Sequence, residues 1–173
     1  AFADCFSTRR SHGGWIIFLN GGPIAWSSRK QTTIATSTTE AEWSECVSCA
    51  KSMLFLKHVM SFLGYSQGPV KIAEDNQACI NCIKGPAVSK RLRWYDVFYY
   101  KIREWHVQDE IALHYVRSAR NLADIMTKQL DPVTHGRLRS AIYGLTEWAF
   151  DINTANQSRK RTAAEMEGSG DEL

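Results

Sequence analysis

A long helix is predicted to begin in the stretch Thr36-Ser37-Thr38-Thr39-Glu40-Ala41-Glu42-Trp43. Thr39 and Glu42 have the spacing of a capping box, in which side chains at a helix start satisfy free backbone N–H groups. Apolar residues then recur at helical spacing until Gly64 ends the pattern. The sequence therefore predicts a helix from Thr39 to about Leu63, with Glu42 in its first turn.

The segments on either side of this helix have the patterns of strands and shorter helices. Two β-rich runs, Trp15 to Leu19 and Pro23 to Ser27, flank Asn20-Gly21-Gly22, which is typical of a β-hairpin. Further strands are predicted at 70–73 and 111–116, and further helices at 77–84, 91–106, 121–128 and 134–143. This order of elements predicts an α/β fold, with a mixed sheet flanked by helices.

The composition indicates a globular protein. Of 173 residues, 44% are hydrophobic and 23% are charged, which is ordinary for one domain, predicted over 1–145. The polar segment 146–173 is predicted to be a disordered tail. No apolar stretch is long enough to cross a bilayer and no secretory signal is evident, so we expect a cytoplasmic protein without membrane contact. The basic cluster Arg159-Lys160-Arg161 leaves a nuclear location open.

The cysteines form two CxxC pairs, Cys46 with Cys49 and Cys79 with Cys82. Such spacing can indicate zinc binding. Both pairs, however, lie within helical patterns, where a separation of three residues places them on one helix face as small apolar residues. Core packing is therefore favoured over zinc, and a zinc-stabilised interaction module is kept as a lesser alternative.

Acidic residues lie in or next to three of the predicted elements. Glu42 lies in the first turn of the long helix, Asp75 follows a strand, and Asp124 lies in a later helix. Two divalent cations about 4 Å apart need hard oxygen ligands, and carboxylates from separate elements can supply them. Taken singly, Glu42 could instead serve in the capping box, and Asp75 in a turn or as an N-cap.

Six motifs occur in one order along the chain. They are Arg9-Arg10-Ser11, Gly21-Gly22-Pro23-Ile24-Ala25-Trp26-Ser27-Ser28, Ser37 to Trp43, Glu74-Asp75-Asn76-Gln77, Ile102-Arg103-Glu104 and Leu122-Ala123-Asp124-Ile125-Met126-Thr127-Lys128. Over roughly residues 1–145 this series resembles the ribonuclease H domain of copia-type retrotransposon Pol polyproteins. The resemblance implies a ribonuclease H-like fold that hydrolyses the RNA strand of RNA–DNA hybrids during reverse transcription.

The resemblance also implies a ligand set for two Mg²⁺ ions, or Mn²⁺ in their place. Glu42, Asp75 and Asp124 match three of the family's four acidic residues. The family's first aspartate aligns with Ala1, so either this ligand is lost or Asp4 substitutes for it. The same alignment implies that part or all of the central first strand is missing, which would leave the edges of neighbouring strands unpaired.

The expected partners are an RNA–DNA hybrid and an upstream reverse transcriptase domain of the same polyprotein. Lys90, Arg91 and Arg93 are candidate contacts to the nucleic-acid backbone, because basic side chains neutralise phosphates. A second reading is kept open: a catalytically inactive relic or fragment that still binds nucleic acid.

Overall fold

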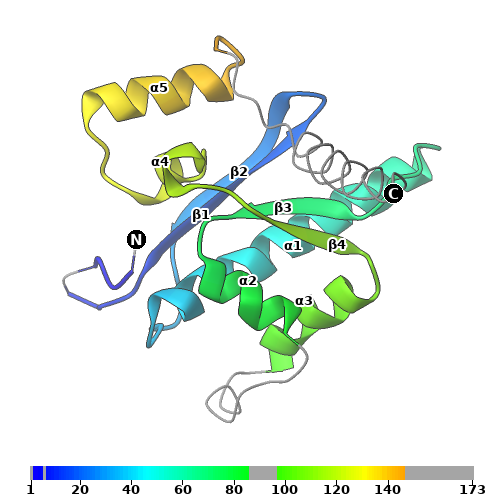
Figure 1. Cartoon of the computed structure of the whole chain (residues 1–173), viewed down its shortest axis with the longest axis horizontal. Coiled ribbons are helices and arrows are strands. Elements are labelled where there is room, and N and C mark those ends of the chain that lie inside the picture. The colour runs from blue at the N-terminus through cyan, green and yellow to red at the C-terminus, as the bar shows by residue number, and fades with distance from the viewer. Residues whose placement is uncertain (1, 6, 86–96, 147–173) are drawn as a thin grey trace, which may run out of the picture.

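The structure, a computed structural model, describes residues 2–5, 7–85 and 97–146 (Figure 1). Within these residues the chain forms a mixed α/β arrangement, as the sequence predicts. The strands are β1 (His12–Leu19), β2 (Gly22–Lys30), β3 (Val70–Glu74) and β4 (Ile111–Tyr115). The helices are α1 (Thr38–Phe62), α2 (Gln77–Lys84), α3 (Val97–Val107), α4 (Asp124–Thr127) and α5 (Pro132–Ile142).

The predicted hairpin is confirmed. β1 and β2 pair in antiparallel fashion through a two-residue turn at Asn20 and Gly21. Both turn residues have positive φ, 50° and 83°, which is the backbone of the hairpin turn that Asn-Gly favours. The long helix is also confirmed, and it ends where Gly64 adopts a φ of 88° and the N–H of Tyr65 donates to the carbonyl of Met60.

One predicted helix is much shorter than expected. The segment predicted as a helix over 121–128 is helical only in α4, Asp124–Thr127, preceded by a 3₁₀ turn at Ser118–Arg120. Asn121 breaks the continuity, because its side-chain oxygen accepts a hydrogen bond from the N–H of Ala123. The first part of the helix predicted over 91–106 and the tail from residue 147 lie outside the described residues.

The strands form two separate pairs. β1 pairs with β2, and β3 pairs with β4 in parallel; among the described residues no strand joins the two pairs. Figure 1 shows β1 and β3 as the facing members of these pairs. The register of β3 with β4 places Glu74 opposite Tyr115, so both parallel strands end at the same edge.

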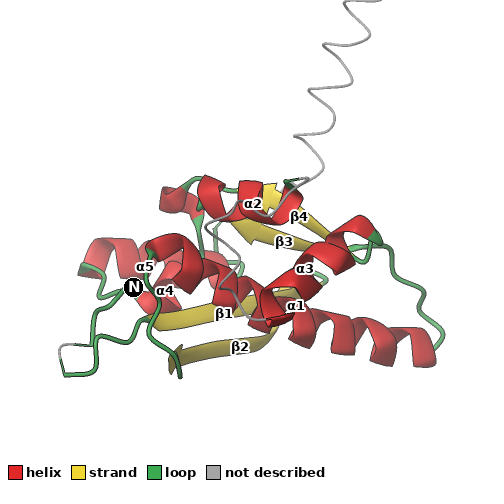
Figure 2. Cartoon of the chain, turned by 90° about the horizontal axis from the view of Figure 1, so that it is seen from below, coloured by secondary structure: helices red, strands yellow, loops and turns green. Residues whose placement is uncertain are grey.

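The hydrophobic core is divided into two clusters, as the strands are divided into two pairs. The larger cluster joins α1, α2 and α3 to β3 and β4, and includes Trp43, Val47, Ile72 and Ile102. The second cluster gathers Leu122 and α5 residues, with Ile16 and Phe18 of β1 packed against them. α1 contacts both β1 and β3, so it runs alongside both pairs of strands (Figure 2). No helix of the described part is long and apolar enough to cross a membrane.

Candidate active site

The start of α1 leaves Glu42 free for a functional role. The N-cap is Ser37, whose hydroxyl accepts a hydrogen bond from the N–H of Glu40 at 3.1 Å. The Glu40 carboxylate in turn accepts from the N–H and the hydroxyl of Thr36, at 2.6 and 2.7 Å. The predicted capping box of Thr39 and Glu42 is therefore wrong by two residues, because an earlier serine satisfies the helix start. Glu42 is not needed for capping.

Asp75 is likewise released from a capping role. The N-cap of α2 is Asn76, whose side-chain oxygen accepts from the N–H of Cys79 at 3.0 Å. Asp75 follows the end of β3 and accepts a hydrogen bond from the Asn121 amide at 3.2 Å. Asn121 lies 46 residues later in the sequence, so this bond ties the end of β3 to the segment that leads into α4. The capping roles considered for Glu42 and Asp75 are therefore both filled by neighbouring residues.

Asp124 is the first residue of α4 and forms an ion pair with Lys128 one turn later. The Lys128 ammonium lies 2.8 Å from one carboxylate oxygen and 2.9 Å from the other. The Asp124 side chain is only 15% exposed, whereas that of Lys128 is 43% exposed. The ion pair therefore places a cation at the solvent side of a largely buried carboxylate.

The charge of Asp75 acts on the other two carboxylates. Burial raises the pKa of Glu42, and the charge of Asp75 raises it further. Burial also raises the pKa of Asp124; the hydrogen bond to Lys128 opposes this effect, and the charge of Asp75 adds to it. The charge of Asp75 thus raises the pKa of both Glu42 on α1 and Asp124 on α4.

The pKa of Lys128 is shifted by the charges of the same three carboxylates. Partial burial lowers the pKa of Lys128, but the hydrogen bond and charge of Asp124 outweigh this effect, and the charges of Asp75 and Glu42 add to it. The net pKa is raised. One ammonium group therefore interacts with all three predicted acidic ligands. The structure brings Glu42, Asp75 and Asp124 into one electrostatic site.

The site opens onto a groove between the two pairs of strands. The groove has a volume of about 820 Å³ and is lined by β1, β3, one face of α1 and the 121–124 segment. Glu42, Asp75 and Asp124 all belong to its lining. The carboxylates therefore lie together at the end of β3, which is where parallel strands present ligand-binding residues.

A fourth acidic residue, Glu74, was not among the predicted site residues. Its carboxylate accepts a hydrogen bond from the Cys46 thiol at 3.1 Å and another from the N–H of Asn76 at 2.9 Å. Burial raises the pKa of Glu74 to about 7, and the charge of Glu42 adds to this effect. The signal in the sequence was its place as the last residue of a short strand, where alternation turns it inward.

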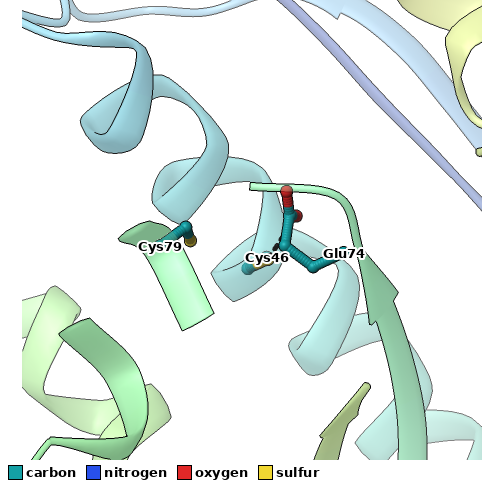
Figure 3. A group of neighbouring side chains, drawn as sticks. All are labelled: Cys46, Glu74 and Cys79. Carbon is teal, nitrogen blue, oxygen red and sulfur yellow. Dashed lines mark hydrogen bonds between the residues drawn. The ribbon is translucent and has the colours of Figure 1, made fainter. Parts of the chain in front are cut away.

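One cysteine from each CxxC pair reaches Glu74. Figure 3 shows Cys46 on α1, Cys79 on α2 and Glu74 on β3 coming together, and their ligand atoms all lie within 4.8 Å of one another. The hydrogen bond with Cys79, followed by burial, raises the pKa of Cys46, which favours the protonated thiol. Cys46, Cys49 and Cys79 are buried, so the prediction that they pack in the core is confirmed.

The other predicted site residues are not brought to the carboxylates. Asp4 is exposed and is absent from the lining of the groove. Its proposed role as a substitute for the first aspartate remains a prediction. Lys90, Arg91 and Arg93 lie outside the described residues, so their contacts to nucleic acid also remain predictions.

Comparison with known proteins gives relatives of one kind. No protein-family model matches the chain. It is 32% identical over 126 residues, 73% of its length, to the retrovirus-related Pol polyprotein from transposon TNT 1-94 of Nicotiana tabacum. It is 28% identical over 133 residues, 76% of its length, to the corresponding polyprotein from transposon RE1 of Arabidopsis thaliana. The transposon Ty1-NL2 Gag-Pol polyprotein of Saccharomyces cerevisiae is 29% identical over 122 residues, 70% of the chain.

The chain matches only a small part of each relative. The matched regions span 10%, 9% and 7% of the three polyproteins. The similarity therefore concerns one segment of much longer proteins. The resemblance to retrotransposon Pol polyproteins that the motifs predict is confirmed at this level: the homologues of this chain are Pol polyproteins of retrotransposons.

Proposed function

We propose that this chain is the ribonuclease H domain of a copia-type retrotransposon polyprotein, and that it cleaves the RNA strand of RNA–DNA hybrids. The observation that carries the proposal is the convergence of Glu42, Asp75 and Asp124 on one groove from three separate elements. Their family-matched positions, and the effect of the Asp75 charge on the pKa of both Glu42 and Asp124, support a shared role. The similarity to Pol polyproteins supports the biological context.

The donor set fits a divalent metal. Three carboxylates offer hard oxygen ligands of the kind that Mg²⁺ and Mn²⁺ take. Burial is the first cause of the raised pKa of both Glu42 and Asp124, and the charge of Asp75 adds to it in each case. Lys128, a single ammonium group, is the cation that the described residues place there. A divalent ion carries more charge than this ammonium and would be favoured at the same position.

Each residue then has a definite task. Glu42, Asp75 and Asp124 would hold the metal ions, and Asn121 fixes the orientation of Asp75 through its amide. Lys128 neutralises Asp124 until the site is filled. When bound, a pair of divalent ions supplies activation of the attacking water and stabilisation of the leaving 3′ oxygen. The placement of the carboxylates must be accurate, because such chemistry depends strongly on geometry.

The proposed substrate and partner follow from the resemblance and the polyprotein context. An RNA–DNA hybrid is the substrate of the family, and a reverse transcriptase domain of the same polyprotein would generate it. Contacts from Lys90, Arg91 and Arg93 to the hybrid backbone belong to this proposal. Binding through such residues would weaken steeply as salt is raised.

The proposal is tested by incubating the folded protein with a hybrid labelled on its RNA strand, with and without Mg²⁺. We expect Mg²⁺-dependent cleavage that Glu42→Gln reduces by at least about 100-fold. Glu40→Gln is the matched control, because it removes a charge two residues away in the same turn and keeps activity. Hybrid binding without cleavage, from protein shown to be folded by circular dichroism, would instead support the inactive nucleic-acid-binding module.

A further inference from the structure

Three donor atoms from three separate elements meet beside the end of β3. They belong to the Cys46 thiol on α1, the Glu74 carboxylate on β3 and the Cys79 thiol on α2 (Figure 3). All three residues are buried, and their ligand atoms lie within 4.8 Å of one another. In a tetrahedral zinc site, sulfur lies about 2.3 Å and oxygen about 2.1 Å from the metal, so the ligand atoms are about 3.6 to 3.8 Å apart. The three donors are therefore close to the spacing that one Zn²⁺ ion requires.

Glu74 is the member of this cluster that core packing does not explain. It is only 7% exposed, and within the described part of the chain it forms no ion pair. Buried carboxylates are normally paired with a cation or coordinate a metal. The Cys46 thiol and the N–H of Asn76 donate hydrogen bonds to Glu74, but neither group carries a positive charge. A bound metal ion would supply the charge that a proton on Glu74 otherwise supplies.

The hydrogen bonds around Glu74 divide the work between its two oxygen atoms. Oε1 accepts from the N–H of Asn76 at 2.9 Å, whereas Oε2 accepts from the Cys46 thiol at 3.1 Å. The side chain of Asn76 also accepts from the N–H of Cys79 at 3.0 Å, so this one residue holds two of the three donors in place. Outer hydrogen bonds of this kind orient metal ligands. Oε2 is therefore the oxygen that would bind the metal once the Cys46 thiol loses its proton.

The donor types select a softer metal ion than the neighbouring carboxylates do. Thiolates favour zinc and Cu(I), whereas Mg²⁺ and Mn²⁺ prefer oxygen ligands. The carboxylate in the set favours Zn²⁺ over Cu(I), because Zn²⁺ accepts both sulfur and oxygen ligands. Cys46 and Glu74 belong to the lining of the groove, which gives an ion and a water molecule access to them. The sequence neighbour Asp75 belongs to the carboxylate site, so two cation sites of different chemistry would meet at the end of β3.

We propose that Cys46, Glu74 and Cys79 bind one Zn²⁺ ion, with a water molecule from the groove as the fourth ligand. Binding releases the thiol protons of both cysteines to solvent, so two thiolates and one carboxylate hold the ion. The ion would link α1, β3 and α2 to one another. Cys49 and Cys82, the other members of the two CxxC pairs, do not belong to the cluster, so this site differs from one built on both pairs. The inference concerns zinc binding and does not require nuclease activity.

The test titrates Co²⁺, a spectroscopic substitute for Zn²⁺, into the reduced whole chain in the presence of excess Mg²⁺. We expect thiolate-to-cobalt charge-transfer absorption that saturates at one ion per chain and disappears when Zn²⁺ is added. Cys46→Ser and Cys79→Ser should each weaken Co²⁺ binding by at least about 100-fold, because a direct ligand matters at least as much as its outer partners. Cys49→Ser and Cys82→Ser are the matched controls, one from each CxxC pair, and should leave Co²⁺ affinity unchanged.

X-ray absorption at the zinc edge of the wild-type protein gives a second measurement that needs no variant. We expect two sulfur ligands at about 2.3 Å and two oxygen ligands, from Glu74 and water, at about 2.0 to 2.2 Å. Four sulfur ligands would mean a site built on both CxxC pairs, and oxygen ligands alone would mean an ion at the carboxylate site. Either result would overturn the proposal. It is also overturned if Co²⁺ gives no charge-transfer absorption, or if folded Cys79→Ser binds Co²⁺ as tightly as wild type.

Discussion

Replacing Glu74 with glutamine should remove the contribution of this carboxyl group to the pH dependence of stability between pH 5 and pH 8. Burial raises the pKa of Glu74 to about 7 from an ordinary value of 4.5. A raised carboxyl pKa means that the folded protein binds the proton more tightly than the unfolded chain. The contribution of this proton is therefore present at low pH and is lost as pH rises toward 7. With 1.36 kcal/mol for each pH unit, the loss between pH 5 and pH 8 is about 2 to 3 kcal/mol.

Urea denaturation at pH 5, 6, 7 and 8 would measure this effect. Glu74→Gln keeps an acceptor for the N–H of Asn76 and removes the charge, so it should stabilise the protein at pH 8 relative to wild type. Glu104→Gln is the control, because that carboxylate is exposed beside Lys101. Parallel pH profiles for wild type and Glu74→Gln would refute the reasoning, since they would mean that Glu74 titrates alike in the folded and unfolded states.

Two further substitutions, one of them with a matched control, test the packing and the charge balance around the groove. Gly13→Ala should destabilise the fold by about 1 to 3 kcal/mol in chemical denaturation, because an added Cβ would clash with the Glu45 carboxylate. Gly68→Ala, where a Cβ meets nothing within 4 Å, should change stability by less than about 1 kcal/mol. Lys128→Met should tighten Mg²⁺ binding in a calorimetric titration by about tenfold, because it removes the ammonium group that competes for Asp124. Unchanged or weaker Mg²⁺ binding would contradict this role for Lys128.

Much of the fold could be predicted from the sequence because its elements carry strong local signals. Asn20 and Gly21 specify the hairpin turn, and Gly64 ends the long helix, both through backbone conformations that few residues adopt readily. α4 was overestimated because helical spacing continues through Asn121, whose side chain bonds to the local backbone instead. Hydrophobic periodicity alone does not reveal this competition.

The three carboxylates of the site could be predicted from the sequence. The roles of the residues around them could be predicted less well. Glu42, Asp75 and Asp124 could be chosen because each lies at the end of an element and matches a family motif. The capping role of Ser37 could not be separated from that of Thr39, since both precede a glutamate by three residues. Alternation along β3 turns Glu74 inward, but its hydrogen bond with Cys46, 28 residues earlier in the sequence, is not encoded by any local pattern.

The most direct test of the account is a calorimetric titration of Mn²⁺ into the wild-type protein and into Asp75→Asn. The charge of Asp75 raises the pKa of both Glu42 and Asp124. If the three carboxylates form one cation site, removing the charge of Asp75 should weaken cation binding. We predict that Asp75→Asn weakens Mn²⁺ binding by at least about tenfold, or about 1.4 kcal/mol. The exposed control Asp109→Asn should leave binding unchanged. Equal Mn²⁺ affinity in wild type and Asp75→Asn would contradict the claim that these carboxylates form a metal site.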